Sequence, residues 1–305
     1  MSWRFTMHSK QHTSSRSFGR LRLTLAAAAL VAGVGTAGTA MADHDRELDG
    51  ARDRGGAVFT MTNDAAGNHV VAYERRTDGT LRQDGVYATN GLGTSKIRLS
   101  SQGSLQLTAD GRFLLVANVG SNQISVFAVR GAHLDLVDVV SSHGTTPNSI
   151  TIHDNLVYVL NNGGAGVGNI AGFVLRPDGK LQFVPGTIRE LGSAGADPAQ
   201  VAFTPDASAL VITEKATSQI DTVPLFFGFP TTITSYASDG VTPFGLDFRH
   251  DGVFVVTNAV NGDKGQASAS AYKLTGYNDE LHTISGAVGD GRSEVCWTIF
   301  SKDEK

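Results

Sequence analysis

The stretches "LQLTADGRFLLVAN" (105–118) and "LDFRHDGVFVVTN" (246–258) follow one pattern: an apolar-alternating strand, a turn with an aspartate, and a second strand rich in Val, Leu and Phe. Segments 150–161, 201–214 and 297–305 repeat it. The turn aspartates lie 44, 52, 45 and 52 residues apart, at Asp110, Asp154, Asp206, Asp251 and Asp303. That period accommodates four short strands per unit.

The second half of each unit repeats as well. "NQISVFAVRGAHL" (122–134) and "NIAGFVLRPDGKL" (169–181) each predict a third strand, a turn and the start of a fourth. No segment has a sustained helical period, so the sequence predicts an all-β chain. A four-stranded unit cannot bury both faces alone and has to stack radially on its neighbours, which predicts a β-propeller. Two β-sandwiches are the alternative, but a regular period across their boundary favours the propeller.

The predicted propeller domain covers residues 57–305. It holds strands two to four of one blade, four complete blades and one leading strand, about five blades in total. An open ring would leave strand edges unpaired. We therefore expect a propeller that is incomplete at its C-terminus.

The N-terminal residues have the pattern of a secretory signal. Basic residues precede the apolar run "LTLAAAALVAGVGTAGTAMA", and Ala40 and Ala42 bracket Met41 in a small-x-small cleavage pattern. We therefore expect a Sec-type signal peptide over 1–42, a disordered leader over 43–56, and a secreted or periplasmic protein with no membrane anchor after cleavage.

Composition excludes several classes of function. The formal net charge is −4, with basic residues concentrated in the predicted signal, so nucleic acid is not an expected partner. The single cysteine, Cys296, cannot form an internal disulfide. We find no metal-ligand spacing, nucleophile elbow or phosphate loop, and we expect no cofactor and no metal site. A full-length chain is expected to be a monomer.

The chain resembles the bacterial lactonase-type seven-bladed propeller family, which includes 6-phosphogluconolactonase and carboxymuconate cyclase. Five segments carry the resemblance: 101–127, "ADPAQVAFTPD" (196–206), "LVITEKATSQIDT" (210–222), "TPFGLDF" (242–248) and "CWTIFSKD" (296–303). It implies a lactonase or cyclase with His, Arg and Glu in a central channel. No His or Arg occupies the matching positions, Gly103, Asn148, Ala199, Phe244 and Cys296.

Residues that close the second strand of each unit should meet at one rim of the channel. Four are asparagines that suit a turn, Asn63, Asn118, Asn161 and Asn258, but the fifth is Glu214. The resemblance also implies a Glu at the end of this strand. Glu214 is therefore a candidate general base, with a solvated rim carboxylate as the alternative. The next residue, Lys215, should point the other way and be exposed.

Residues that open the first strands offer neutral and aromatic groups suited to a polar organic ring: Gln102, Ser104, Asn148, Gln200, Phe244 and Trp297. The first hypothesis is an exported lactonase-like propeller in which Glu214 activates water while Gln102, Gln200 or Asn148 stabilises the oxyanion. The alternative is a non-catalytic extracytoplasmic propeller that binds a small polar ligand, a polymer or a protein.

Overall fold

The computed structural model describes residues 55–96, 99–276, 279–301 and 303–304. The predicted signal peptide, 1–42, and nearly all of the predicted leader, 43–56, lie outside the described residues. The first strand begins at Gly56, one residue before the predicted start of the propeller domain. The described residues belong to one compact unit.

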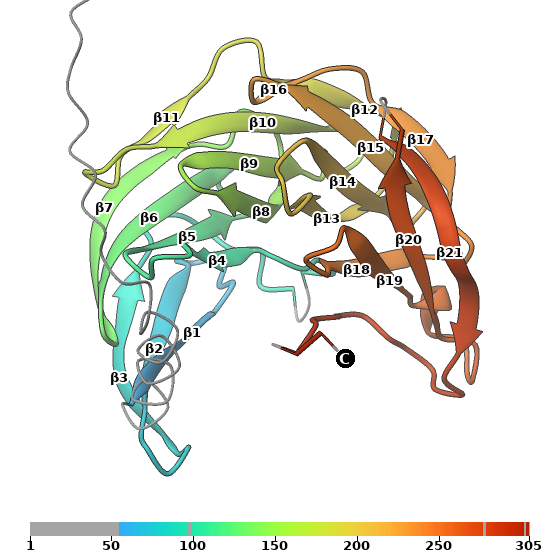
Figure 1. The fold of residues 1–305 in the computed structure, drawn as a ribbon. Coiled ribbons are helices and arrows are strands. Elements are labelled where there is room, and N and C mark those ends of the chain that lie inside the picture. The colour runs from blue at the N-terminus through green and yellow to red at the C-terminus, as the bar shows by residue number, and fades with distance from the viewer. Residues whose placement is uncertain (1–54, 97–98, 277–278, 302, 305) are drawn as a thin grey trace, which may run out of the picture. The chain divides into compact units, whose positions relative to one another are not determined.

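Five antiparallel sheets follow one another along the chain (Figure 1). Sheet I contains β1 (Gly56–Met61), β2 (His69–Arg75) and β3 (Leu81–Ala88). Sheet II contains β4 (Leu105–Leu107), β5 (Phe113–Asn118), β6 (Gln123–Arg130) and β7 (His133–Ser141). Sheet III contains β8 (Pro147–His153), β9 (Leu156–Asn161), β10 (Val167–Leu175), β11 (Leu181–Phe183) and β12 (Arg189–Ala194).

Sheet IV contains β13 (Pro198–Phe203), β14 (Ala209–Glu214), β15 (Gln219–Phe226), β16 (Phe229–Pro230) and β17 (Thr234–Ala237). Sheet V contains β18 (Pro243–Phe248), β19 (Val253–Asn258), β20 (Ser268–Thr275) and β21 (Glu280–Gly289). The one helical element of the described residues is a 3₁₀ turn, Val260–Gly262. The chain is therefore an all-β, propeller-like fold, as predicted.

The predicted strand–turn–strand units are present in sheets II to V. Their first turns hold Asp110, Asp154, Asp206 and Asp251. Three of these aspartates occupy equivalent places, whereas Asp154 lies in a two-residue turn between His153 and Leu156, with a φ of 52°. The fifth unit is a wrong prediction within the described residues, because the segment that precedes Asp303 forms no strand. The segment is held by separate hydrogen bonds to the Gln102 side chain, the Gly245 amide and the Asp247 carboxylate, and not by the continuous backbone pairing of a strand.

The second strands of sheets II to IV, namely β5, β9 and β14, each contribute to two hydrophobic cores, because alternate side chains point to opposite faces of a sheet. On β5, Leu114 and Val116 pack towards sheet I, whereas Phe113 and Leu115 pack towards sheet III. On β14, Leu210 and Ile212 join the core with sheet III, and Val211 joins the core with sheet V. The cores therefore lie between sheets and not within them, which is the packing that radial stacking requires.

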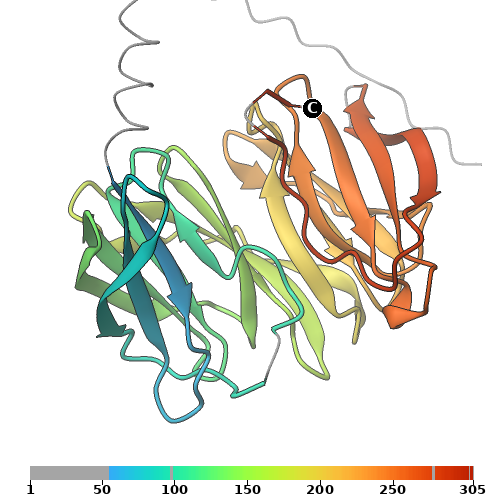
Figure 2. The same ribbon diagram turned by 90° about the horizontal axis from the view of Figure 1, so that it is seen from below.

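The first strands of sheets II to V, namely β4, β8, β13 and β18, lie innermost and contact one another in succession. The C-terminal segment runs beside β18 in both views (Figures 1 and 2). The Gly245 amide donates to the Cys296 carbonyl at 3.0 Å, and the Phe300 amide donates to Asp247 at 2.6 Å. A Cβ at Gly245 would lie 2.6 Å from that carbonyl oxygen, so this close approach requires glycine.

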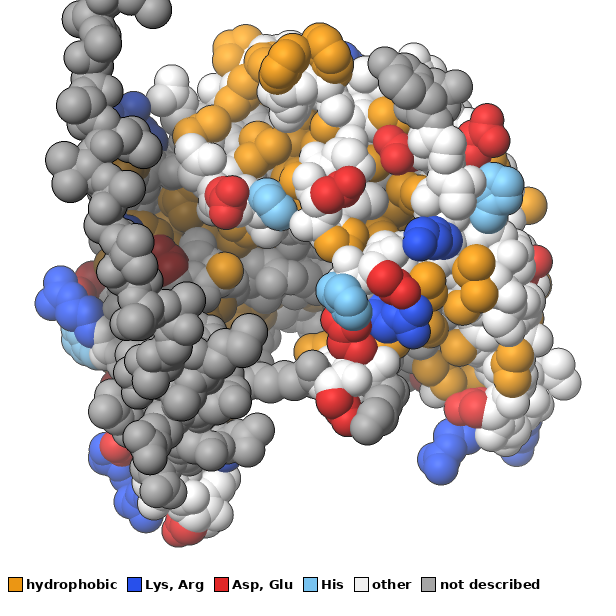
Figure 3. All heavy atoms as spheres, viewed as in Figure 1, with side chains coloured by type: hydrophobic (Ala, Val, Ile, Leu, Met, Phe, Trp, Pro, Cys, Tyr) orange, Lys and Arg blue, Asp and Glu red, His pale blue; other side chains and the backbone are white. Residues whose placement is uncertain are grey.

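The outer surface carries one concentration of exposed aromatic side chains. Phe226, Phe227 and Phe229 surround the β15–β16 turn, where Figure 3 shows hydrophobic side chains on the surface. No helix among the described residues is long and apolar enough to span a bilayer.

Candidate functional site

The five residues predicted at one rim do occupy comparable places, but they are buried. Asn118, Asn161, Glu214 and Asn258 are the last residues of the second strands, and Asn63 follows β1 by two positions. All five are at most 7% exposed. In sheets II and V the amide donates to a serine on the third strand, with Asn118 to Ser125 at 2.7 Å and Asn258 to Ser270 at 3.0 Å. The position therefore links two strands inside the protein.

In sheet IV both members of this pair are acids. Glu214 takes the asparagine position, and Asp221, which lies opposite Ile212 in the β14–β15 ladder, takes the serine position. Glu214 is 1% exposed and Asp221 is fully buried. Glu214 accepts a hydrogen bond from Thr217 at 2.5 Å. Burial, and then the neighbouring Glu214, raise the pKa of Asp221 to about 7. Glu214 is not among the residues that line the cavity described next, and its predicted role as a base stays a prediction.

Lys215 is buried, and the prediction of an exposed lysine is wrong. Only 7% of the residue is exposed, because its ammonium group has partners in the interior. Nζ donates to the Ser100 carbonyl and lies 3.3 Å from Asp197 Oδ1. It also lies 5.3 Å from the centroid of the Phe244 ring, within the range of a cation–π contact. Alternation explains the position, because Glu214 faces sheet III and Lys215 faces sheet V.

The Lys215 amine has an altered proton affinity and a spare donor. Burial lowers its pKa, and the Asp197 carboxylate partly opposes this shift. An ammonium group has three N–H donors, and Ser100 and Asp197 account for two of them. The third has no hydrogen-bond acceptor among the described residues, so a bound molecule could accept from it.

A cavity of about 330 Å³ surrounds this group, and we call it the Lys215 cavity. Phe244 and Trp297 form its aromatic wall, with ring centroids 6.0 Å apart and the planes at 75°. Cys296 and Glu294, from the C-terminal segment, complete one side. Two of the predicted binding residues, Phe244 and Trp297, are thus brought together with a lysine that the sequence reading had assigned to the surface.

Three other predicted binding residues brace the inner strands. Gln200 bonds the Leu246 backbone in both directions, at 2.9 and 2.7 Å, and Gln102 does the same to Thr298, at 3.0 and 3.2 Å. Asn148 donates to the Pro198 carbonyl at 2.8 Å. Both ends of the two glutamine side chains and the Asn148 Nδ2 group are therefore engaged with backbone, whereas Asn148 Oδ1 is buried with no hydrogen-bond partner among the described residues. None of the three residues lines the Lys215 cavity.

Ser104 lines a second cavity, of about 360 Å³, with Ser101 and Trp297. Trp297 borders both cavities and donates from Nε1 to the Ser101 carbonyl at 3.2 Å. The indole is 62% exposed, so it separates the two spaces without closing either.

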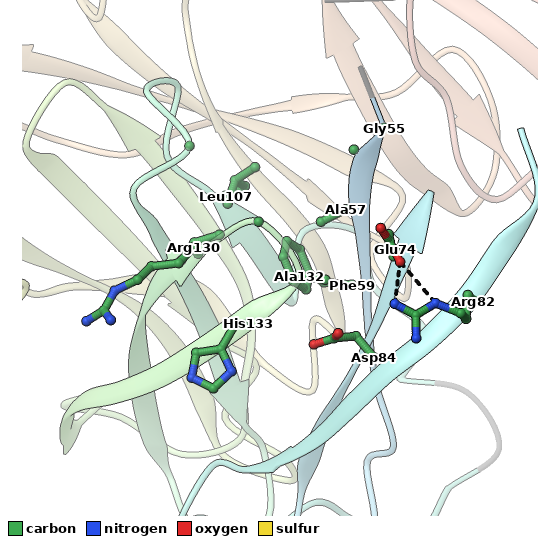
Figure 4. A pocket seen from close by; sticks show the side chains of 14 residues that line it. Gly55, Ala57, Phe59, Glu74, Arg82, Asp84, Leu107, Arg130, Ala132 and His133 are labelled. Carbon is green, nitrogen blue, oxygen red and sulfur yellow. Dashed lines mark hydrogen bonds and ion pairs between the residues drawn. The ribbon is translucent and has the colours of Figure 1, made fainter. Parts of the chain in front are cut away.

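A larger cavity, of about 590 Å³, lies between sheets I and II (Figure 4). Its charged side chains already form exposed pairs: Arg82 with Glu74 at 2.5 Å, and Arg130 with Asp135 at 3.0 Å. Such solvated pairs are weak and have no need of a ligand. The Lys215 cavity, with its desolvated cation, is the better candidate.

No group of three or more His, Cys, Asp or Glu within the described part of the chain is arranged to hold a metal ion. The candidate functional residues that the sequence pattern did not predict are Lys215 and Asp197. The predicted β13–β14 hairpin contained the signal, because pairing of Pro198 with Glu214 brings the preceding Asp197 next to the following Lys215. The Lys215 amide donates to the Asp197 carbonyl at 3.2 Å.

Among solved structures, the chain is similar to a candidate 6-phosphogluconolactonase from Bacteroides uniformis, with a TM-score of 0.60, 14% identity, and coverage of 82% of this chain and 72% of that one. A protein from Lactobacillus plantarum gives a TM-score of 0.60, 16% identity, and coverage of 78% and 68%. A functionally unknown protein from Desulfotomaculum acetoxidans gives a TM-score of 0.58 and 13% identity, with coverage of 82% of this chain and 74% of that one. At these identities the likeness shows the fold alone.

The sequence matches no curated protein. Residues 66–170 match the family model described as "Lactonase, 7-bladed beta-propeller". That range contains Gln102, Ser104 and Asn148, whereas Lys215, Phe244 and Trp297 lie beyond it. The family match covers about a third of the chain, and with the fold shared by the solved structures it agrees with the resemblance to the lactonase-type β-propeller family.

Proposed function

We propose that this protein hydrolyses a lactone or another cyclic ester in the Lys215 cavity. The observation that carries the proposal is the buried ammonium group of Lys215, which faces the cavity beside Asp197 and the Phe244 ring. The family match supports the reaction class. Desolvation strengthens the attraction between such a cation and negative charge that develops on a substrate.

The residues divide the reaction between them. Lys215 Nζ would donate its third N–H to the lactone carbonyl oxygen, and Asp197 would accept a proton from the attacking water. A C–O bond forms from water to the carbonyl carbon, and the ring C–O bond then breaks. The proton held by Asp197 passes to the departing alkoxide, so one lactone and one water yield one hydroxy acid.

The Asp197 carboxylate is open to the attacking water. Its side chain is 53% exposed, and Oδ1 is oriented by Asn162 at 2.9 Å as well as by Lys215. The aromatic wall of Phe244 and Trp297 suits the flat face of a small polar ring. The proposed ligand is therefore a small cyclic ester and not a nucleic acid or a membrane.

A non-catalytic binding propeller is the second candidate function. Its support is that Gln102, Gln200 and Asn148, the neutral donors expected at the oxyanion, all bond neighbouring backbone. Lys215 would then bind a ligand oxygen without any chemical step.

The test is turnover of a panel of five- and six-membered lactones by the purified protein, followed by acid release. We expect Lys215→Met to lower kcat/KM by about a hundredfold or more, and Asp197→Asn to act mainly on kcat. Lys180→Met, on an exposed lysine, is the control. Lactone binding without turnover, lost in Lys215→Met, would favour the binding propeller. Unchanged turnover in that variant would exclude the Lys215 cavity.

We also propose export to a secreted or periplasmic location. The support is the basic and apolar pattern of residues 1–42. N-terminal sequencing of exported protein should begin near Asp43, and an intact N-terminus would refute cleavage.

A further inference from the structure

The buried pair of Glu214 and Asp221 lacks the donor that the same two positions have elsewhere in the chain. In sheets II and V an asparagine N–H donates to a serine oxygen there. Two carboxylates can only accept hydrogen bonds, so they cannot form this link while both are ionised. Glu214 Oε1 and both oxygens of Asp221 have no hydrogen-bond donor of normal geometry among the described residues.

We propose that Asp221 and Glu214 share one proton, and that this shared proton fixes the end of β14 and thereby positions Lys215. The protonated Asp221 on the third strand donates to the Glu214 carboxylate on the second strand. This bond replaces the asparagine–serine hydrogen bond of sheets II and V, in which the second strand donates to the third. Two adjacent carboxyl groups can be buried without a large free-energy cost only if one of them is protonated and therefore neutral.

No cation replaces the proton among the described neighbours. Lys215 directs its Nζ to Asp197 and Ser100. The other charged residues on the packed elements are Arg189 and Glu190 of β12 and Asp239 after β17, and the main causes of the shifted pKa of Asp221 are burial, Glu214 and Ser235 instead. Arg189 donates instead to the carbonyls of Pro230 and Thr231. The Ser235 hydroxyl on β17 opposes the raised pKa only in part.

Loss of the shared proton should affect the Lys215 cavity through the backbone at the end of β14. Glu214 is the last residue of β14, and the next amide, that of Lys215, is fixed to the Asp197 carbonyl. Two negative charges at this buried place repel each other, so the end of β14 and the Lys215 backbone have to move apart from β15. Glu214 and Asp221 are thus positioning residues that act through Lys215.

The pH dependence has a definite sign. The pKa of Asp221 is raised in the folded protein, from 3.8 to about 7. The folded state therefore holds a proton that the unfolded state has lost, and stability is highest below the unfolded pKa and decreases as pH rises through this window. The expected decrease in Tm is about 3–5 °C per pH unit between these values, with no further decrease above the folded pKa.

The decisive variant restores the pair found in sheets II and V, as Glu214→Asn with Asp221→Ser in the full chain. We expect it to remove this part of the pH dependence of Tm and to abolish the infrared carbonyl band of a buried protonated carboxyl group. Asp221→Asn, whose side-chain amide can donate to Glu214, should have both effects as well. It provides the test if the double variant does not fold. A Tm profile and infrared band equal to those of the wild type would overturn the proposal. So would a Tm that rises with Ca²⁺ in the wild type alone, since the pair would then hold a metal ion.

The positioning role of Glu214 and Asp221 rests on the proposed function. It is tested by the pH dependence of kcat, separately from the Tm and infrared measurements of the shared proton. The wild-type kcat should decrease by at least about tenfold as pH rises through the ionisation of the pair, and this limb should disappear in the double variant. A retained limb would refute positioning. If no lactone is turned over, the Tm and infrared measurements still decide whether the proton is shared.

Discussion

Gly245→Ala tests how the C-terminal segment forms one side of the Lys215 cavity. The added Cβ would lie 2.6 Å from the Cys296 carbonyl oxygen and 3.1 Å from Trp297 Cα, and it would also meet Gln102 Oε1. Gln102 can move aside, but the two backbone groups can yield only if the segment leaves β18. The substitution should therefore detach Cys296 and Trp297 while sheet V stays folded.

Its magnitude follows from the hydrogen bonds that would be lost. These are Gly245 N to Cys296 O at 3.0 Å, Thr257 Oγ1 to the same oxygen at 3.0 Å, and the two bonds between Gln102 and Thr298. At about 0.5 kcal/mol each, the low end of the net contribution of a hydrogen bond that water can replace, the loss is about 2 kcal/mol. That corresponds to a roughly thirtyfold faster amide exchange in the segment.

Hydrogen exchange followed by mass spectrometry measures this on the peptide that contains Thr298 and Phe300. Gly286→Ala is the matched control, because a Cβ there would meet nothing within 4 Å. Exchange in Gly245→Ala equal to that of the wild type would refute the reasoning. It would mean that the segment is held by contacts other than those at β18.

Two further predictions concern stability and association. Gln200→Leu leaves the buried Leu246 amide and carbonyl without their side-chain partner, so the free energy of unfolding should fall by about 2–4 kcal/mol and Tm by several degrees, measured by circular dichroism; a change below one degree would contradict the bracing role. β1 is an edge strand of sheet I in the described structure, so Val58→Lys should reduce self-association in light scattering, and equal association in both proteins would show that this edge is not the contact.

The strand pattern was predictable because it depends on local alternation and on turn chemistry. In three of the first turns the aspartate accepts from the backbone amide two residues on: Asp110 from Arg112 at 3.0 Å, Asp206 from Ser208 at 3.1 Å and Asp251 from Val253 at 3.1 Å. These bonds require no information from other sheets. The segment from Cys296 onward has the same local pattern, but its described residues form no strand. Its conformation depends on Gln102 and Asp247, which are remote in sequence.

The site was less predictable, because residue type does not reveal the partners of a side chain. Glutamine and asparagine at the inner strands suggest ligand donors, yet Gln200 and Asn148 bond backbone. A lysine after a strand suggests solvent, yet Lys215 finds a carbonyl, a carboxylate and an aromatic ring from three separate segments. Only the pairing of β13 with β14, extended by one residue, indicates that Asp197 and Lys215 meet.

The sharing of β5, β9 and β14 between two cores each also determines how the protein can unfold locally. Leu114 and Leu115 are adjacent in sequence but belong to different cores, so a sheet that opens removes one apolar face from each neighbour. The free energy of packing is therefore concentrated in the cores between neighbouring sheets, and we call each of these cores a joint. Each sheet is coupled to the next along the chain, as in a one-dimensional array of repeats. Local opening should start at sheets I and V, which have one such joint each among the described residues, and sheet III should be the last to exchange its amides.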